Sequence, residues 1–194
     1  MTDSDRNRPE SAADLEARRA AAVRAARSKL PGHRNLLREA RHGRNLSAAM
    51  LPLFLLRPPR GYGILITTGR KTGKRRRKCM RVIRSGDKAY LTQLLLPHVA
   101  VDRPFAASGW LLNIRANPHV RLKIRGGTFS GTVREITEPQ ELAAARAVLT
   151  ETVVPLDFGE CLLHMRGAPS RTKIQELHRY WFDTGHPLVI DLEV

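Results

Sequence analysis

Between residues 62 and 136 the chain consists mainly of short β-like runs joined by tight turns, and this pattern restricts the fold more than any other feature. The runs cover residues 62–68, 76–83, 88–94, 120–125 and 128–136, with turn-forming residues at 69–74, 85–87 and 126–127. Helix-like segments are inserted between the hairpins and do not alternate with single strands. The pattern predicts an α+β fold built on an antiparallel barrel and argues against a parallel doubly wound sheet.

Helices are predicted around this strand-rich region. Residues 12–29 have a strong helix-forming composition, but the apolar face is mostly alanine and would bury little. Further helices are expected at 45–56, 105–116 and 170–182, and another opens at Thr137, which would cap it ahead of Pro139; a last strand is expected at 188–192. The chain then divides into a disordered tail with a basic helical extension (1–44) and a barrel domain (45–194).

Positive charge is concentrated in one segment of the chain. The whole sequence has 34 Lys and Arg against 18 Asp and Glu, a net charge of +16, and residues 57–88 alone hold 12 basic residues against the single Asp87. A uniformly basic surface would suit loose association with nucleic acid or anionic lipid. The concentrated charge instead indicates a defined anionic partner.

The turn at residues 69–78 is the clearest candidate for a ligand site, because seven of the nine residues from 70 to 78 are cationic. Gly69 and Gly73 allow a sharp turn with exposed N–H groups, and the arginines and the Thr72 hydroxyl would complete a phosphate cradle. The spacing is not that of a P-loop, since the two glycines are too close and no Ser or Thr follows Lys74. Charge alone leaves a solvated hairpin or a nucleic-acid contact equally open.

Other classes of protein and site are disfavoured. The longest apolar run, residues 46–56, is far shorter than the roughly 20 residues of a membrane span. The polar N-terminus gives no export signal, which indicates a cytoplasmic protein with Cys79 and Cys161 as reduced thiols. Lys78 and Arg81 could favour a thiolate at Cys79, but a passive strand thiol is the preferred interpretation. The seven histidines show no paired spacing for a metal, so no metal site is expected.

Two motifs, Ile-Leu-Ile-Thr-Thr-Gly-Arg-Lys-Thr-Gly at 64–73 and Trp-Leu-Leu-Asn-Ile-Arg-Ala-Asn-Pro at 110–118, resemble the deazaflavin-dependent nitroreductase family, also called deazaflavin-dependent quinone reductases. The similarity runs from about residue 45 to the C-terminus. It implies a split β-barrel of the pyridoxamine-phosphate-oxidase or FMN-binding type, with peripheral helices and here an N-terminal helical extension. It also implies coenzyme F420, rather than FMN, as the cofactor. The phosphodiester and oligoglutamate tail of that coenzyme would account for the concentrated positive charge.

The resemblance assigns cofactor contacts by position. It places the phosphate and tail near Arg70, Lys71, Thr72, Gly73 and Arg76, and the deazaflavin ring near Cys79 and Arg81, where the family commonly has Pro and an aromatic residue. The predicted cofactor-binding set is completed by Thr68, Gly69, Met80 and Trp110. The family's Ser-Lys-Gly-Gly turn is replaced by Leu-Leu-Leu-Pro at 94–97, which alters part of the cofactor site and would suit a greasier pocket.

The last helix carries the candidate catalytic residues. Where the family has a tyrosine-rich helix over the substrate, this sequence has His178, Tyr180 and Trp181. An imidazole at His178 could donate a proton or a hydrogen bond to a substrate carbonyl, although a surface or core-edge histidine is the alternative. Trp110 and Trp181 are expected to pack as core aromatics.

The resemblance implies an oxidoreductase that transfers a hydride from the reduced deazaflavin to an apolar acceptor such as a quinone, an enone or a nitro compound. One alternative is a non-catalytic lipid or fatty-acid binding protein on the same barrel, which residues 94–96 favour. Nucleic-acid binding is disfavoured because no aromatic residue interleaves with the basic run. Peripheral attachment to an anionic membrane, at the inner face of the cell membrane, through the N-terminal basic region stays open, as does the choice between monomer and homodimer.

Overall fold

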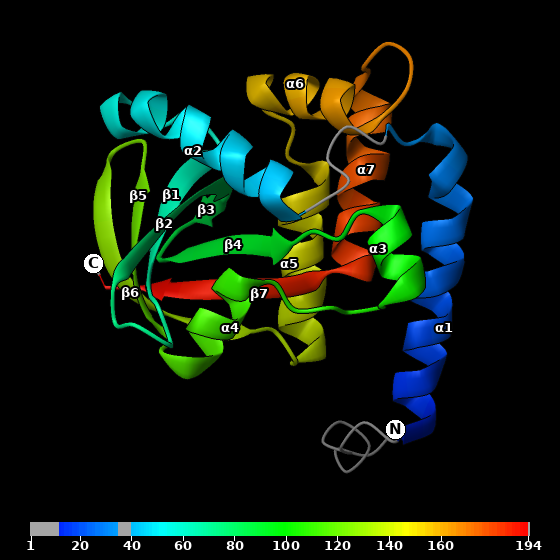
Figure 1. Cartoon of the computed structure of the whole chain (residues 1–194), viewed down its shortest axis with the longest axis horizontal. Helices are drawn as coiled ribbons and strands as arrows, with labels where there is room; N and C mark the ends of the chain where they lie inside the picture. The colour runs from blue at the N-terminus through cyan, green and yellow to red at the C-terminus, as the bar shows by residue number, and fades with distance from the viewer. Residues whose placement is uncertain (1–11, 35–39, 194) are drawn as a thin grey trace.

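The computed structural model describes residues 12–34 and 40–193, and a seven-stranded antiparallel sheet forms its centre (Figure 1). The strand order is β2-β1-β5-β6-β7-β4-β3. The strands are β1 (Tyr62–Thr68), β2 (Arg75–Arg81), β3 (Ile83–Ser85), β4 (Lys88–Gln93), β5 (His119–Ile124), β6 (Gly127–Glu135) and β7 (His186–Leu192). The helices are α1 (Ala12–Lys29), the 3-10 turn η2 (Leu30–Gly32), α2 (Ala40–Leu56), α3 (Pro97–Asp102), α4 (Gly109–Ala116), α5 (Pro139–Glu151), α6 (Pro155–His164) and α7 (Arg171–Thr184).

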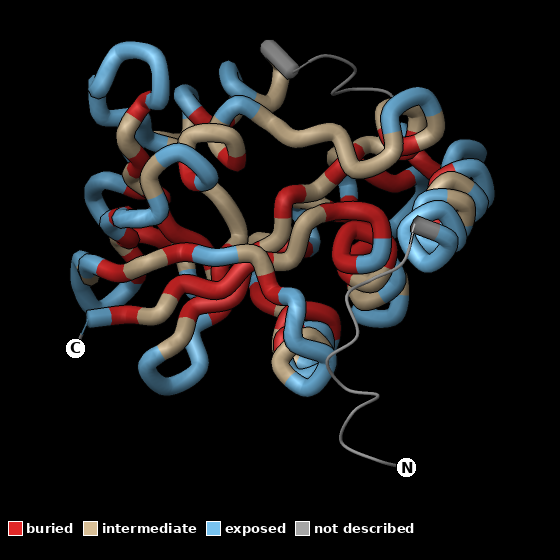
Figure 2. The backbone as a smooth tube through the Cα atoms, turned by 90° about the horizontal axis from the view of Figure 1, so that it is seen from below, coloured by how far each residue is buried: buried red, intermediate tan, exposed pale blue. Residues whose placement is uncertain are grey.

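The sheet curls around a core of branched side chains that α4 closes from below (Figure 1). Leu65 of β1, Leu91 of β4 and Leu122 of β5 are fully buried in this core, together with Leu111 of α4. Buried residues therefore follow the strands, while the turns are exposed (Figure 2). The curled antiparallel sheet with inserted helices confirms the predicted α+β fold and the split barrel that the resemblance implies.

Helices α2 and α5 lie against the outside of the curled sheet, whereas α1 stands to one side of it beside α3 and α7 (Figure 1). Helix α2 lies over β1 and β2, and α5 packs against β3, β4 and β7 and against α7. Helix α1 packs against α3 and α7 through small residues, because Ala22 and Ala26 are its buried side chains. No helix in the described ranges is long and apolar enough to cross a membrane.

Strand β2 lies at one edge of the sheet, so half of its backbone groups have no strand partner. Helix α2 covers part of this edge: the Cys79 N–H donates a hydrogen bond of 2.9 Å to Ser47 Oγ, and Lys78 Nζ donates to the Gly43 carbonyl at 3.1 Å. The remaining part of the edge, at residues 75–77, is exposed and carries only arginine. Helix α2 and the cationic side chains together therefore keep a strand of another molecule from pairing with this edge.

Some of the predicted helix boundaries are wrong. The helix expected from residue 105 begins at Gly109, because Phe105 has a positive φ of 57° that no helix accommodates and the Ser108 side chain caps α4 by accepting a hydrogen bond from Leu111 N. Helix α5 begins after Glu138, so Thr137 is not its cap. Helices α3 and α6 were not predicted. The predicted disordered tail lies outside the described residues.

The leucines that replace the family's glycine turn help to build a second core. Leu94 and Leu95 pack with α1, α3, α6 and α7, and the Leu95 carbonyl accepts a hydrogen bond from the Tyr180 hydroxyl at 3.1 Å. These leucines therefore contribute to helix packing. The more apolar substrate pocket that the sequence suggested would have to be formed by other residues.

Candidate functional site

The turn between β1 and β2 is closed by its own backbone. Gly69 N–H donates to the Lys74 carbonyl at 2.9 Å, and the Gly69 carbonyl accepts from Gly73 N–H at 2.8 Å and from Thr72 N–H at 3.2 Å. Gly73 has a φ of 65°, a conformation that L side chains rarely adopt. A Cβ at Gly69 would lie 3.1 Å from the Lys74 carbonyl oxygen. The two glycines therefore allow residues 69–74 to reverse the direction of the chain in a tight turn.

A pocket of about 290 Å³ lies between this turn and the first residues of α4. It is lined by Gly69, Arg70, Lys71, Thr72, Arg76, Gly109 and Asn113, and five of these seven residues belong to the two motifs that carry the family resemblance. At the start of α4 the N–H groups of Gly109 and Trp110 have no partner within the helix, Leu111 N–H being capped by Ser108, and the positive end of the helix dipole adds to a setting that favours an anion. Three cationic side chains, a hydroxyl and a helix N-terminus therefore border one pocket.

Helix α4 is fixed against the turn by side-chain amides. Asn113 Oδ1 accepts a hydrogen bond from the Arg70 N–H at 3.2 Å, which joins the helix to the turn. Gln93 of β4 is almost completely buried, and it accepts from Ser108 N–H at 2.7 Å and donates to the Ala106 carbonyl at 2.6 Å. The start of α4 is thus held by β4, and its middle is held by the turn.

The donor set of this pocket fits the anionic arm of a phosphorylated coenzyme. Arg70 and Arg76 can each offer two parallel N–H groups to phosphate oxygens, and Lys71 adds a mobile ammonium group. Arg70, Lys71 and Arg76 are exposed, and no carboxylate lines the pocket. An anion can therefore bind here without displacing an existing ion pair from the described residues.

Cys79 and Arg81, which the resemblance places near the deazaflavin ring, do not line this pocket. Cys79 is covered by α2 and buried among Phe54, Tyr62 and Ile64, and the Arg81 side chain reaches α5 and α6. Burial raises the pKa of the Cys79 thiol, and the neighbouring Lys78 only partly opposes this shift. Cys79 is thus a packed strand thiol in this structure.

Arg81 belongs to a buried polar network centred on Asp157 of α6. Its Nε donates to Asp157 Oδ1 at 3.1 Å, and its two terminal nitrogens donate to the carbonyls of Leu149 and Thr152. Asp157 also accepts from the Tyr62 hydroxyl at 2.7 Å, and it is 1% exposed. Each of the three guanidinium nitrogens of Arg81 thus already donates a hydrogen bond within the protein. Arg81 therefore links β2 to α5 and α6, and it is not available to a ligand in this arrangement.

His178 lies at the edge of the same network. Its Nε2 is 3.8 Å from Asp157 Oδ2, and its ring is tilted against Trp181. Burial, followed by the nearby Arg81 charge, lowers the pKa of His178 to about 3, so the imidazole is neutral. Tyr180 is buried as well. Neither residue lines the pocket at the 69–74 turn.

The remaining predicted residues fall into three places. Thr68 ends β1 next to the turn, whereas Met80 and Trp110 are partly buried and pack against the central core. Trp181 is 2% exposed, in the second core. The structure thus brings the predicted phosphate residues together and separates them from His178 and Tyr180.

Sequence reasoning missed Asn113, Gly109, Ser108 and Gln93 as site residues. Asn113 and Gly109 could have been identified from the sequence, because Asn113 is part of the second motif and Gly109 directly precedes it. Nothing local in the sequence singles out Gln93, whose role depends on the loop that folds back over β4. Across the described residues, His, Cys, Asp and Glu form no group of three or more that could hold a metal ion.

Comparison with known proteins gives one strong match. The family model described as F420H(2)-dependent quinone reductase matches residues 57–155, about half of the chain, and this span contains both motifs and the whole pocket. No curated protein sequence matches the chain.

Solved structures show weaker likeness. An F420-H2 dependent reductase, FDR-A, is 15% identical, with 68% of this chain and 94% of that chain covered at a TM-score of 0.46. A domain-swapped dimer is 17% identical, with 76% and 95% covered at 0.46. An F420 reductase is 18% identical, with 73% and 92% covered at 0.36. With TM-scores below 0.5, these likenesses add nothing to what the family model and the pocket indicate.

Proposed function

Because the chain belongs to the family of F420H(2)-dependent quinone reductases, we propose that the pocket between the 69–74 turn and α4 holds the phosphate-bearing arm of its cofactor, coenzyme F420. The chain is an oxidoreductase, and the coenzyme supplies the hydride chemistry when it is bound. The observation that carries the proposal is that one pocket is lined by both motifs, with Arg70, Lys71 and Arg76 on one wall and Asn113 on the other.

In this proposal the residues of the chain bind the coenzyme and orient it. Arg70 and Arg76 neutralise the arm, and the Thr72 hydroxyl and the start of α4 direct hydrogen bonds to it. The predicted barrel domain, residues 45–194, contains all of these groups. Helix α1 would then support the site indirectly, through α3 and α7.

For His178 and Tyr180 we propose a supporting role in place of direct contact with substrate. A neutral, buried imidazole beside Asp157 suits a position that orders α6 and α7 behind the sheet. The Tyr180 hydroxyl is committed to the Leu95 carbonyl. Hydride transfer would then depend on the placement of coenzyme and acceptor more than on a side-chain proton donor.

The acceptor is an apolar small molecule in this proposal, with quinones ahead of enones and nitro compounds, in keeping with the family. The lipid-binding alternative rested on residues 94–96. Leu94 and Leu95 now lie in a helix-packing core, so no specific observation favours that alternative.

An acceptor panel tests the proposal. Purified full-length chain is mixed with reduced coenzyme F420 and menadione, cyclohexenone or a nitroimidazole, and recovery of the oxidised coenzyme is followed by its fluorescence. We expect protein-dependent oxidation that is fastest with the quinone. The proposed acceptor class is wrong if no acceptor raises the rate above that of coenzyme and protein without acceptor.

A further inference from the structure

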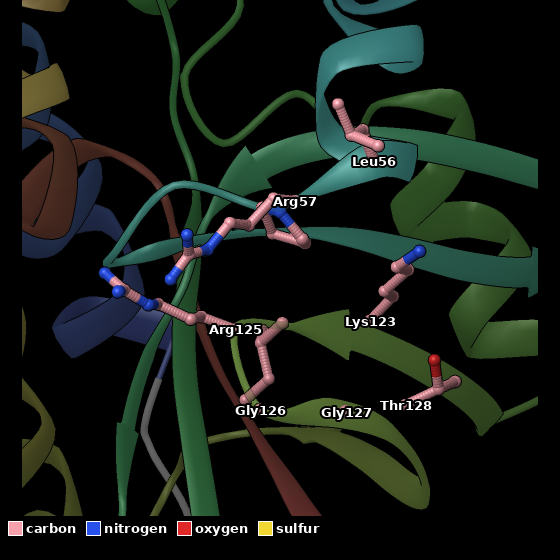
Figure 3. Close-up of a pocket in the computed structure, with 9 residues that line it drawn as sticks. Leu56, Arg57, Lys123, Arg125, Gly126, Gly127 and Thr128 are labelled. Carbon is pink, nitrogen blue, oxygen red and sulfur yellow. The ribbon is translucent and has the colours of Figure 1, made fainter.

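A second, larger pocket lies at the opposite end of β1 from the cofactor turn. It has a volume of about 470 Å³ and lies between the C-terminal end of α2 and the turn that joins β5 to β6 (Figure 3). The strand register separates the two pockets: Ile124 pairs with Gly63 at the start of β1, whereas the cofactor turn follows Thr68 at its end. This pocket is therefore no part of the coenzyme site.

The pocket is bordered by cations and by no carboxylate. Figure 3 shows the side chains of Arg57 and Arg125 extending in the same direction from opposite walls. Among the described residues, neither guanidinium group has a hydrogen-bond or ion-pair partner. Two unpaired guanidinium groups bordering one pocket are suited to an anion with several oxygens, such as a phosphate group.

Three leucines near the C-terminal end of α2 are exposed, and one of them, Leu56, lines the same pocket. Leu53 and Leu56 are 59% and 84% exposed, and Leu55 is 41% exposed, whereas Phe54 between them is fully buried and anchors the helix. We call the set Leu53, Leu55, Leu56, Arg57, Lys123 and Arg125 the α2 tip. Large apolar side chains standing in water beside cations are typical of surfaces that dock on another phase or molecule.

Hydrogen bonds to its backbone carbonyls hold the α2 tip in place. Lys123 Nζ donates a hydrogen bond to the Leu55 carbonyl, and Arg57 N–H donates to the Leu53 carbonyl at 3.0 Å. A cation at the last carbonyls of a helix also compensates the negative end of the helix dipole. The leucines therefore project from a fixed helix end, next to the two guanidinium groups that have no partner in the described part of the chain.

We propose that the α2 tip binds the surface of an anionic lipid bilayer, with a lipid phosphate between Arg57 and Arg125 and the leucines at the boundary of headgroups and acyl chains. Charge complementarity favours this occupant, because cations and apolar side chains match the two layers of such a surface. A second copy of the chain would bring the same cations and a net charge of +16. The proposal concerns the other end of β1 and does not rest on the assigned cofactor.

Vesicle sedimentation of the full chain tests this proposal at low salt. The chain should pellet with vesicles of phosphatidylcholine mixed with phosphatidylglycerol, and not with vesicles of phosphatidylcholine alone. In Arg57→Gln/Arg125→Gln the partition coefficient should fall about tenfold or more, because each basic residue near an anionic surface adds to binding. Leu53→Ser/Leu56→Ser should weaken binding to a similar degree through the lost apolar contact.

A matched control is Arg19→Gln/Arg24→Gln, which removes the same charge from exposed positions of α1. This control should bind vesicles nearly as well as the wild type. Equal losses in both arginine pairs would mean that net charge alone drives binding and would overturn the proposal. So would full binding by the leucine variant combined with displacement by inorganic phosphate at constant ionic strength, which would point to a site for a free anion. Circular dichroism and an unchanged coenzyme titration would verify that each variant is folded.

Discussion

Asn113 joins the two motifs of the chain: its side-chain oxygen accepts a hydrogen bond from the backbone N–H of Arg70, 43 residues earlier, at 3.2 Å. The bond fixes the start of the cationic turn against α4, so that the turn and the helix border one pocket. We therefore expect coenzyme binding to depend on this junction more than on the total charge of the chain.

Replacing Asn113 should therefore weaken coenzyme binding without unfolding the chain. In Asn113→Ala we expect the dissociation constant of oxidised coenzyme F420 to rise about tenfold, the effect of losing one positioning hydrogen bond. Fluorescence titration measures it. Asn117→Ala is the control, since Asn117 Oδ1 accepts from His119 N–H at the other end of α4 and should leave the affinity unchanged. Equal losses in the two variants would contradict a specific role for Asn113.

Two glycine substitutions separate the effect of backbone strain on stability from the effect of the cofactor turn on coenzyme binding. Gly73 and Gly86 have φ values of 65° and 64°, and a Cβ at either position would meet no atom within 4 Å. Gly73→Ala and Gly86→Ala should each lower the free energy of unfolding by roughly 1–2 kcal/mol, measured by urea denaturation. Only Gly73→Ala should also weaken coenzyme binding. Similar coenzyme affinities in the two variants would show that the shape of the cofactor turn does not matter.

The buried pair of Arg81 and Asp157 should contribute strongly to stability when only one partner is removed. Asp157→Asn leaves the Arg81 charge uncompensated in the interior and should cost about 3–5 kcal/mol of unfolding free energy. Asp183→Asn breaks an exposed pair with Arg146 and should cost only about 0.2–1 kcal/mol. Chemical denaturation of both variants compares them. Comparable small losses would mean that Arg81 finds other compensation.

His164 should make the stability of the chain sensitive to acid. Burial lowers its pKa to about 4 in the folded chain from an ordinary value of 6.5, so the unfolded state binds the extra proton first. The free energy of unfolding should therefore fall as the pH drops from 6.5 towards 4, by up to about 1.4 kcal/mol per pH unit from this residue. His164→Gln should remove that part of the slope. Parallel pH profiles of wild type and variant would contradict this prediction.

The locally encoded parts of the fold and of the site could be predicted from the sequence. The β-like runs and the turn chemistry at Gly69 and Gly73 indicate the hairpin, and the basic run at 70–78 places the cationic side chains around it. The structure agrees on the antiparallel sheet, because hairpin registers depend mainly on such local signals.

The parts that depend on long-range packing could not be predicted. The Arg81–Asp157 pair joins residues 76 positions apart, and α6, which carries Asp157, was not predicted at all. The raised pKa of Cys79 agrees with the passive strand thiol that the sequence favoured, but the burial beneath α2 that outweighs the neighbouring charges depends on the fold. His178 looked like a substrate contact by its place in the last helix, and the fold around it makes it an interior residue.

The most direct test of the central claim is a coenzyme titration of Arg70→Gln/Lys71→Gln/Arg76→Gln beside Lys74→Gln/Arg75→Gln/Arg77→Gln. Both triple variants lose the same charge from the same exposed hairpin, but only the first changes residues that line the pocket. Fluorescence quenching of oxidised coenzyme F420 should give a dissociation constant at least about a hundredfold higher for the first variant, because several charge-assisted hydrogen bonds are lost, and a much smaller rise for the second. Equal affinities in the two variants would contradict the claim that this pocket holds the coenzyme.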